Sequence, residues 1–198
     1  NCLSTVAVSG TRSIGGIVGV NYNLISECSS CGGITGFREV GGIAGVCFGN
    51  IECCYNIGSV VGDNHAGGVS GLVLDNSTVA NSYNLGSVTG FGLTTGGLVG
   101  SLANSTVYCC YNAGAVNCDC FSGLIGLLEY SDVIGSFWDI DASGQRYSWG
   151  GTGLIIIYMR YLTSYMNADW DFMEEIANGE DDIWGINPSE NDGYFFLA

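Results

Sequence analysis

The sequence lacks lysine altogether, has one histidine and one proline, and contains no long run of apolar residues. It has four arginines and 19 acidic residues, which gives a formal net charge of −15. Four basic residues are too few to neutralise the phosphates of a nucleic acid. Nucleic-acid binding is therefore excluded. The single histidine excludes most histidine-dependent catalysis and most histidine-based metal sites. The longest apolar run, residues 154–159, is far shorter than the roughly 20 residues of a membrane span, so we expect none.

Cysteine, by contrast, is abundant, with ten residues in a chain of 198. Cytosolic proteins hold few disulfides, so this abundance indicates either extracellular disulfides or metal ligands. Cys28 and Cys31 form a CxxC pair with no second pair to match it, which favours disulfides over a zinc ribbon. We therefore expect an extracellular chain, at a cell surface or in a sheath. The disulfide candidates are Cys2, Cys28, Cys31, Cys47, Cys53, Cys54, Cys109, Cys110, Cys118 and Cys120.

A short block of glycine and apolar residues recurs along the first two thirds of the chain. The second residue of its Gly-Gly pair stands at positions 16, 42, 68 and 97, and a degenerate copy has Ser-Gly with its Gly at 123; the steps are 26, 26, 29 and 26 residues. Between these blocks lies a second pattern, Tyr-Asn-x-Gly, at residues 55–58, 83–86 and 111–114. Three columns of this alignment are apolar throughout: Ile25, Ile51, Val79, Val107 and Val133; Val8, Ile34, Val60, Val88 and Val116; Ile17, Ile43, Val69, Leu98 and Leu124.

Three short apolar segments per repeat, separated by Gly and Asn, predict three strands joined by tight bends. A period of about 26 residues without a helical stretch suits one coil of a β-solenoid, in which each strand pairs in parallel with its equivalent one coil on. Parallel crossovers are right-handed in nearly all cases. The fold class expected is therefore all-β, a right-handed parallel β-solenoid with glycines at its corners.

These blocks resemble the GLUG repeat, which is named for its Gly-Leu-any-Gly core. The core stands here as Gly-Leu-Val-Gly at residues 97–100, with the partner segment Asn-Ser-Tyr-Asn-Leu-Gly-Ser-Val-Thr-Gly at residues 81–90. The likeness covers residues 1–136, and residues 137–198 look like the segment that ends many GLUG arrays. That family occurs on secreted and surface proteins, including adhesins and the non-catalytic part of some immunoglobulin-cleaving peptidases. The resemblance implies a surface-displayed solenoid and no activity.

Two regions follow: a solenoid over residues 1–136 and a C-terminal capping segment over residues 137–198. The second region holds all four tryptophans and 11 of the 19 acids. A capping box at Asp171 and the pair Asn178-Gly179 predict one short helix between them. A second helix is expected from Thr152 to about Tyr165.

The first repeat is entered in mid-coil, and no basic segment followed by an apolar run precedes it. This indicates a processed chain or a fragment. Because a bare terminal coil exposes unpaired backbone, either upstream repeats were removed or another subunit covers this edge.

Most cysteines fall into register when they are placed on the repeat. Cys2, Cys28, Cys54 and Cys110 share one column with Ser82 and Ser136, and Cys53 and Cys109 share the neighbouring column. Stacked equivalents lie about 4.8 Å apart, within the range that a disulfide tolerates. In each Cys-Cys pair one sulfur points inward and one outward unless a corner separates them. The remaining four cysteines lie near glycine-rich bends, which we expect to be exposed. The bridges are open to two interpretations, within one chain or between subunits.

No constellation for catalysis, metal or cofactor binding emerges, and we expect no enzyme. His65 lies in a polar bend with no second histidine. The pairs Asp139/Asp141 and Asp181/Asp182 have the oxygen ligands for a hard cation, although solvated acids on a cap are the favoured explanation. Two sequons occupy one column, and their asparagines, Asn76 and Asn104, are glycosylation candidates.

We interpret the chain as a structural subunit of an extracellular sheath or surface layer, built by edge-to-edge stacking of its own copies and locked by disulfides. The composition is similar to the disulfide-hardened sheath of some methanogenic archaea. The alternative is the solenoid stalk or binding module of a secreted adhesin. A carbohydrate-active or ice-binding face is disfavoured because Val61 and Asn117 interrupt the column that holds Thr35 and Thr89.

Overall fold

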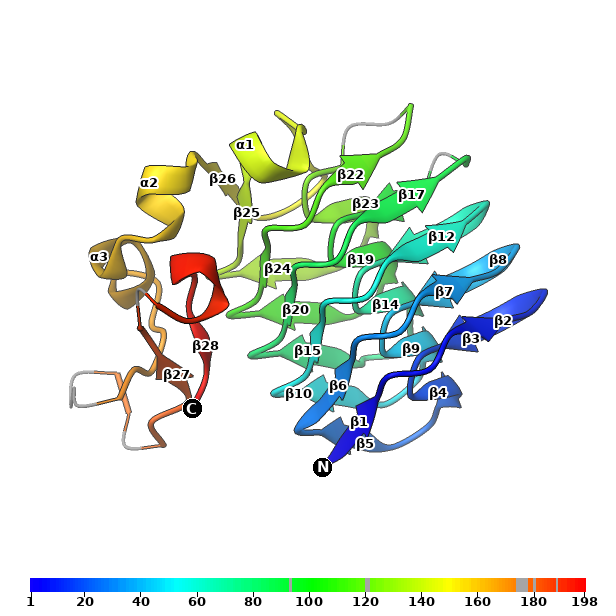
Figure 1. Cartoon of the computed structure of the whole chain (residues 1–198), viewed down its shortest axis with the longest axis horizontal. Coiled ribbons are helices and arrows are strands. Elements are labelled where there is room, and N and C mark those ends of the chain that lie inside the picture. The colour runs from blue at the N-terminus through cyan, green and yellow to red at the C-terminus, as the bar shows by residue number, and fades with distance from the viewer. Residues whose placement is uncertain (93, 120–121, 174–177, 180, 188) are drawn as a thin grey trace.

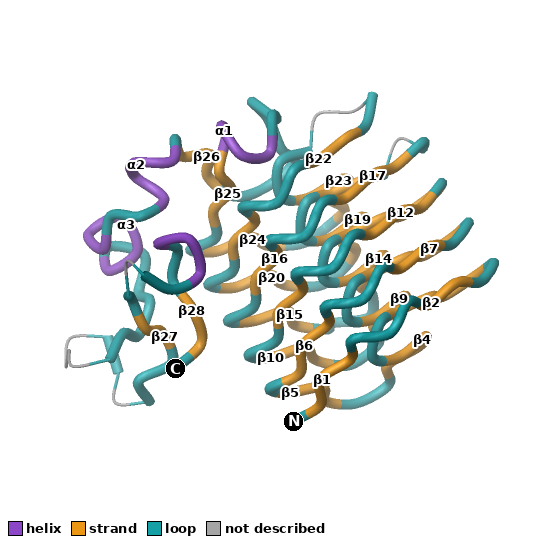
Figure 2. Tube along the Cα trace, in the orientation of Figure 1, coloured by secondary structure: helices purple, strands orange, loops and turns teal. Residues whose placement is uncertain are grey.

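The chain winds upward in successive coils (Figures 1 and 2), and each of the first four passes through five short strands. The structure is a computed structural model that describes the chain except residues 93, 120–121, 174–177, 180 and 188. Equivalent strands of successive coils form five parallel sheets in the described part of the chain, named A to E here in the order in which one coil visits them.

Sheets A and B carry the first two strands of each coil. Sheet A contains β1 (Cys2–Ser4), β6 (Cys28–Ser30), β11 (Tyr55–Asn56), β16 (Tyr83–Asn84), β21 (Tyr111–Asn112), β25 (Phe137–Asp139) and β26 (Thr152–Leu154). Sheet B contains β2 (Val8–Ser9), β7 (Ile34–Thr35), β12 (Val60–Gly62), β17 (Val88–Gly90) and β22 (Val116–Asn117).

Sheets C, D and E complete the coil. Sheet C contains β3 (Arg12–Gly15), β8 (Arg38–Gly41), β13 (Asn64–Gly67) and β18 (Thr95–Gly96). Sheet D contains β4 (Val18–Asn21), β9 (Ala44–Cys47), β14 (Ser70–Val73), β19 (Val99–Ala103) and β23 (Ile125–Glu129). Sheet E contains β5 (Leu24–Ser26), β10 (Asn50–Glu52), β15 (Thr78–Ala80), β20 (Thr106–Tyr108) and β24 (Asp132–Ile134).

The register of these sheets confirms the predicted parallel solenoid. Ile51 pairs with Ile25 on one side and with Val79 on the other, as the first apolar column requires. Val60 pairs in the same way with Ile34 and Val88 in the second column. Side chains of equal type therefore stack along the solenoid axis and fill its interior.

The third apolar column lies elsewhere than predicted. Ile43 stands at the bend between β8 and β9 rather than in a strand, and its side chain is fully buried in the core. The glycine-rich segments on either side of the bend, which were expected to be corners, are themselves the strands of sheets C and D. Each of the first four coils thus has five strands and not three.

Sheets C and D approach each other so closely that a glycine column is required between them. A Cβ at Gly71 would lie 2.5 Å from the backbone nitrogen of Val40, which is a backbone contact that cannot yield. The spacing of the Gly-Gly-x-x-Gly block is therefore set by a backbone-to-backbone contact between two sheets.

The solenoid has two interior clusters. The larger one runs the length of the stack and includes Ile43, Ile51, Val79, Leu98, Val107 and Leu124 together with the inward thiols of Cys28, Cys54 and Cys110. The smaller one fills the space between sheets B and C with Ile34, Val40, Val60, Ala66 and Val88.

The residues after β25 first close the last coil. The helix α1 (Ile140–Ser143) follows β25 directly, with Asp139 as its N-cap. The loop after α1 then pairs with the last coil, because Gly123 N–H donates to Tyr147 O (2.9 Å) and Trp149 N–H donates to Ile125 O (3.3 Å). The end of the stack opposite the N-terminus is thereby covered over part of its backbone (Figure 1).

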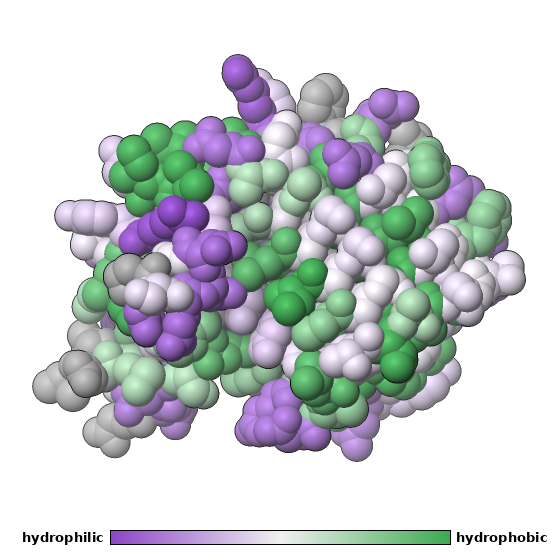
Figure 3. Space-filling view, in the orientation of Figure 1, coloured by the Kyte–Doolittle hydropathy of each residue, from purple (hydrophilic) through white to green (hydrophobic). Residues whose placement is uncertain are grey.

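The remaining C-terminal residues lie along the side of the solenoid, against sheet A (Figures 1 and 2). They form α2 (Ile156–Met159), α3 (Leu162–Met166), the antiparallel pair β27 (Trp184–Gly185) and β28 (Phe196–Leu197), and the 3₁₀ turn η1 (Asn191–Gly193). We call residues 156–198 the flank. The exposed side chains of α2 contribute a hydrophobic surface at the upper left of Figure 3.

The two helices predicted in this region have different outcomes. The single helix expected over residues 152–165 is wrong: β26 continues sheet A first, and the helical part breaks between α2 and α3 at Arg160 and Tyr161. Strand pairing with β25 outweighs helical propensity at residues 152–154. The other helix was expected between Asp171 and Asn178. Phe172 instead forms a parallel bridge with Trp184, and residues 174–177 lie outside the described residues. Among the described helices, none has the length and apolar character to cross a membrane.

Candidate functional site

Each coil turns from sheet E into sheet A at one residue with a left-handed backbone. This corner column consists of Glu27, Cys53, Asn81, Cys109 and Gly135, with φ between 47° and 53° in each case. The corner therefore lies at the first cysteine of each Cys-Cys pair. Asn and Gly tolerate this conformation at little cost, whereas Cys and Glu do not.

The residue after each corner points into the core. At this position Cys and Ser make equivalent hydrogen bonds to backbone groups. The Cys54 N–H donates to Ser82 Oγ (3.1 Å), the Cys110 N–H donates to Ser136 Oγ (3.1 Å) and the Cys28 N–H donates to Cys54 Sγ (3.4 Å). Each thiol or hydroxyl in turn donates to the carbonyl two residues earlier, at 3.1 Å from Cys54 Sγ to Glu52 O. The inward thiols therefore satisfy backbone groups at a buried corner.

Burial makes these thiols unreactive. It raises the pKa of the Cys54 thiol to about 12 and the pKa of the Cys110 thiol further still. Because the thiolate is the reactive form, both cysteines are poor nucleophiles at neutral pH.

This role yields a direct prediction for Cys54. Cys54→Ser should change the free energy of unfolding by less than about 1 kcal/mol, because serine fills the same position in two other coils. Cys54→Val should cost about 1–3 kcal/mol, because it leaves the Cys28 N–H without an acceptor. Urea unfolding followed by circular dichroism measures both. Equal and large losses in the two variants would contradict this role.

The two outward cysteines have different surroundings. Cys109 is buried under the flank, with its Sγ 3.8 Å from Ala168 O, and burial raises its pKa to about 12. Cys53 is half-buried at the edge of an open cleft. Its pKa is raised by burial first, and then by the neighbouring carboxylates of Glu52 and Glu27.

The remaining disulfide candidates differ in how exposed they are. Cys2 is exposed on β1 and Cys31 is half-buried. Cys47 is fully buried, and its Sγ accepts from Asn21 Nδ2 (3.3 Å), so its predicted exposure at a bend is wrong. Cys118 is disulfide-bonded, and Cys120 lies outside the described residues. The free thiols in the structure are those of Cys2, Cys28, Cys31, Cys47, Cys53, Cys54, Cys109 and Cys110.

A stack of aromatic rings runs along the outer face of sheet A. Tyr55, Tyr83 and Tyr111 stack with ring centroids 5.0 Å apart and nearly parallel planes. The next residues of this column toward the N-terminal end are Ser29 and Leu3, so the stack stops at Tyr55. The sequence pattern Tyr-Asn-x-Gly held the signal for this stack, because its Tyr recurs once per coil.

The flank covers only part of that stack. Trp170, Trp184 and Phe195 are buried against Tyr83 and Tyr111, and the Tyr111 hydroxyl donates to Phe195 O (2.6 Å). Burial raises the pKa of Tyr111 well above its ordinary value. Nearer the N-terminal end the flank diverges from the solenoid and leaves Tyr55 half-exposed.

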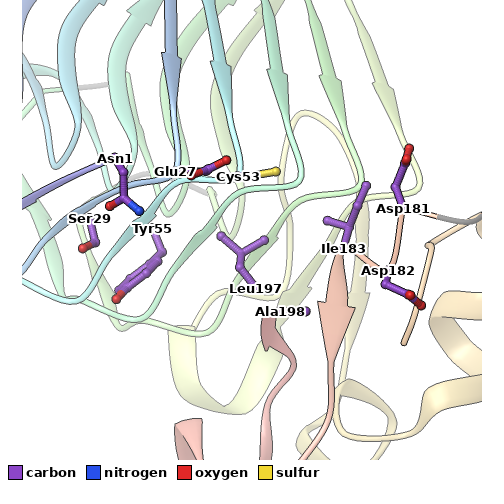
Figure 4. Close-up of a pocket in the computed structure, with 10 residues that line it drawn as sticks. All are labelled: Asn1, Glu27, Ser29, Cys53, Tyr55, Asp181, Asp182, Ile183, Leu197 and Ala198. Atoms are coloured by element: carbon purple, nitrogen blue, oxygen red, sulfur yellow. The ribbon is translucent and has the colours of Figure 1, made fainter. Parts of the chain in front are cut away.

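Between the first coils and the flank lies a cleft of about 400 Å³. Its solenoid wall carries Asn1, Glu27, Ser29, Cys53 and Tyr55, and its flank wall carries Asp181, Asp182, Ile183, Leu197 and Ala198. Figure 4 shows Glu27 beside Cys53 on one side and Asp181 beside Ile183 on the other. The cleft thus combines one open aromatic ring with carboxylates on both walls.

The other polar candidates are Asp139, which has a structural role, and His65, which lies away from the cleft. Asp139 Oδ1 accepts from Ala142 N–H, and its Oδ2 accepts from the Tyr194 hydroxyl (2.7 Å), so this carboxylate holds α1 and the flank together. His65 is half-buried near Glu39, and burial lowers its pKa. Among the described residues, no three His, Cys, Asp or Glu side chains are grouped so as to hold a metal ion.

The two sequon asparagines lie on adjacent coils. Asn76 and Asn104 are both exposed, and the Asn76 N–H donates to Asn104 O (2.7 Å). Both have a left-handed backbone and line a shallow polar depression with Tyr130 and Asp132.

Comparison with known proteins gives a likeness in fold and no match to a family model or to a curated sequence. No family model matches the chain, and no curated protein matches its sequence. Among solved structures, the chain is similar to the crystal structure of a Bacteroides ovatus protein described as a "putative immunoglobulin A1 protease", with a TM-score of 0.56 and 21% identity. The match covers 100% of this chain and 56% of that one, so the chain spans little more than half of the relative's length. At this identity the likeness shows a shared fold.

Proposed function

We propose that this protein is a structural β-solenoid subunit that joins copies of itself along the solenoid axis, in an extracellular sheath or surface layer. One observation carries the proposal. Each first strand, β1 to β5, has a strand partner on one side only within the described chain, so the first coil presents a continuous open edge. Unpaired strand edges are templates for pairing with another chain.

The two ends of the stack differ, and this difference supports an open assembly. At the far end, the loop after α1 covers part of the last coil, whereas no segment of the described chain pairs with the outer edge of the first coil. A contact between unlike ends is heterologous, so it leaves one open end on every copy and continues without closing. A contact between two open ends would stop at a dimer.

The positions of the thiols limit which cysteines can form disulfides between subunits in such an assembly. The buried thiols of Cys28, Cys54 and Cys110 are held in the core. Cys2, Cys31 and Cys53 belong to the first coils and are exposed or half-buried free thiols. Because all three lie at one end of the stack, an end-to-end contact does not bring them against one another. We therefore infer that disulfides between subunits draw on these three residues where neighbouring stacks lie side by side, and that the role is a non-enzymatic one.

Size measurement with and without reductant tests this function. The wild-type chain should form assemblies larger than a dimer in sedimentation velocity, and oxidised assemblies should resist detergent until a reductant is added. Cys2→Ser/Cys31→Ser/Cys53→Ser should still assemble but dissolve in detergent alone. A wild-type chain that remains monomeric at all concentrations would overturn the proposal.

The stalk of a secreted adhesin is a second candidate, favoured by the same open edge. An upstream coil of a longer chain would pair with β1 to β5 just as a second copy would. In that case the chain should stay monomeric, and a version extended by one further coil should be more stable. The exposed Asn76 and Asn104 are compatible with glycans on a surface protein in either case.

A further inference from the structure

The turn that leads from sheet D to sheet E in the fourth coil presents an asparagine amide to solvent. Asn104 is exposed there, Ser105 is buried, and Thr106 lines the same shallow depression as Asn104. No hydrogen bond within the described chain engages the side-chain amide of Asn104, whereas the buried Asn84 uses both atoms of its amide in the ladder. An outward amide with a hydroxyl two residues further on is the acceptor arrangement for an N-linked glycan.

An exposed tyrosine stands directly beside this asparagine, one coil further on. Ala103 pairs with Glu129 and Thr106 pairs with Asp132, so the two turns have equal length and Tyr130 takes the position of Asn104. Both residues have φ of 48°, so their side chains leave the backbone in the same direction. Equivalent positions on successive coils lie about 4.8 Å apart, which is a distance at which two flat groups pack face to face.

The ring of Tyr130 has no packing role in the solenoid itself. It is 92% exposed, the largest fraction among the large apolar side chains of the described chain. An aromatic ring left in water gains by covering its face with another group. A pyranose ring has such a surface in its C–H groups, and its hydroxyls would meet the polar depression that Tyr130 and Asp132 line with Asn104.

We propose that Asn104 carries an N-linked glycan whose first sugar packs on the ring of Tyr130. In the transfer, Asn104 Nδ2 attacks C1 of a sugar that is bound through phosphate to a polyprenyl carrier. The bond from Nδ2 to C1 forms, and the bond from C1 to the phosphate oxygen breaks. The carrier leaves with its phosphate, one amide proton passes to a base of the transferase, and nothing is oxidised or reduced.

The second sequon lacks this support. Thr78 pairs with Thr106, so Asn76 stands one coil before Asn104, and its neighbour toward the C-terminal end is Asn104 rather than a ring. Both asparagines line one depression, so a sugar on Asn104 occupies the space that a sugar on Asn76 needs. Asn104 is therefore the main site, and Asn76 is modified less often.

This modification rests on the extracellular location in the proposed function and is independent of the proposed assembly. Asn104 lies on the side of the stack, between β19 and β20, and not at either end. A glycan there leaves the open edge of β1 to β5 uncovered. Loss of the glycan should consequently leave end-to-end association unchanged.

Peptide mapping by mass spectrometry tests the site on the full chain secreted from a host with an oligosaccharyltransferase. Asn104 should be modified in most molecules, and Asn76 should be modified at least about threefold less often. Thr106→Ala should abolish modification of Asn104, and Thr106→Ser should keep it, because serine retains the hydroxyl. A secreted wild type without a glycan on Asn104 would overturn the proposal.

Enzymatic release of the glycan from the folded chain tests the contact with Tyr130. An amidase that cleaves the bond between asparagine and sugar should act on Asn104 at least about fivefold faster in Tyr130→Ala than in the wild type. Tyr130→Phe should behave as the wild type does, because it keeps the ring. The control is Tyr22→Ala, which removes an exposed ring from the corresponding turn of the first coil and should leave the rate unchanged.

Equal release rates in the wild type and Tyr130→Ala would show that the sugar does not pack on this ring. Sedimentation velocity on the same preparations separates this result from the proposed function. Chains that assemble without a glycan on Asn104 contradict this inference alone, and glycosylated chains that never assemble contradict the proposed function alone.

Discussion

Gly68→Ala should destabilise the solenoid by about 3 kcal/mol or more, because a single methyl group has no room at this bend. A Cβ at Gly68 would overlap the carbonyl oxygen of Gly97 and lie 2.5 Å from Asn84 Nδ2. The first of these neighbours is backbone of the next coil, and the second belongs to a buried hydrogen-bonded side chain. Neither can move without breaking the register of two coils.

Gly33→Ala is the matched control. The nearest atom to a Cβ at Gly33 is Ser59 Oγ at 3.4 Å, and the backbone there is not left-handed. This variant should unfold within about 0.5 kcal/mol of the wild type, as surface substitutions commonly do. Urea unfolding followed by circular dichroism compares the two. A Gly68→Ala chain as stable as Gly33→Ala would show that the coils are not packed as described.

Asn84→Leu should be at least as damaging, because it removes the centre of a buried ladder. Asn84 Nδ2 donates to Asn112 Oδ1 (2.8 Å) and to Gly86 O (2.8 Å). Asn84 Oδ1 accepts from Asn56 Nδ2 (2.8 Å) and from Gly86 N–H (3.1 Å). Leucine leaves four buried groups without these partners, at about 1–3 kcal/mol each, which approaches the whole stability of an ordinary domain.

Asn117→Leu tests whether the effect belongs to the ladder rather than to asparagine in general. Asn117 lies in β22 and is exposed, so its replacement should leave the unfolding midpoint almost unchanged. Thermal unfolding of the three chains side by side provides the comparison. Similar midpoints for Asn84→Leu and Asn117→Leu would contradict the ladder.

The sequence pattern predicted the solenoid because its columns repeat chemistry and not only spacing. Stacking in register requires equal residues one coil apart, so Ile51 and Val60 each recur in kind and were assigned to the right strands. Sheets C and D were missed because their glycines resemble corners. In fact those glycines, Gly71 among them, allow two backbones to touch.

The direction in which each cysteine side chain points depends on a corner at Cys53, and a cysteine in the sequence does not indicate a corner. Cysteine does not favour a left-handed backbone, but Asn81 and Gly135 in the same column do, and they were the available signal. The cleft was beyond prediction from the sequence. It exists because the flank folds back over Tyr83 and Tyr111 but not over Tyr55, and that depends on tertiary packing around Trp184.

Diffraction from oriented wild-type assemblies tests the central claim most directly. If copies join end to end, the strands lie across the assembly, and the strand spacing of about 4.8 Å should appear as a reflection along its long axis. A 4.8 Å reflection at right angles to the long axis would place the solenoids crosswise and contradict end-to-end association.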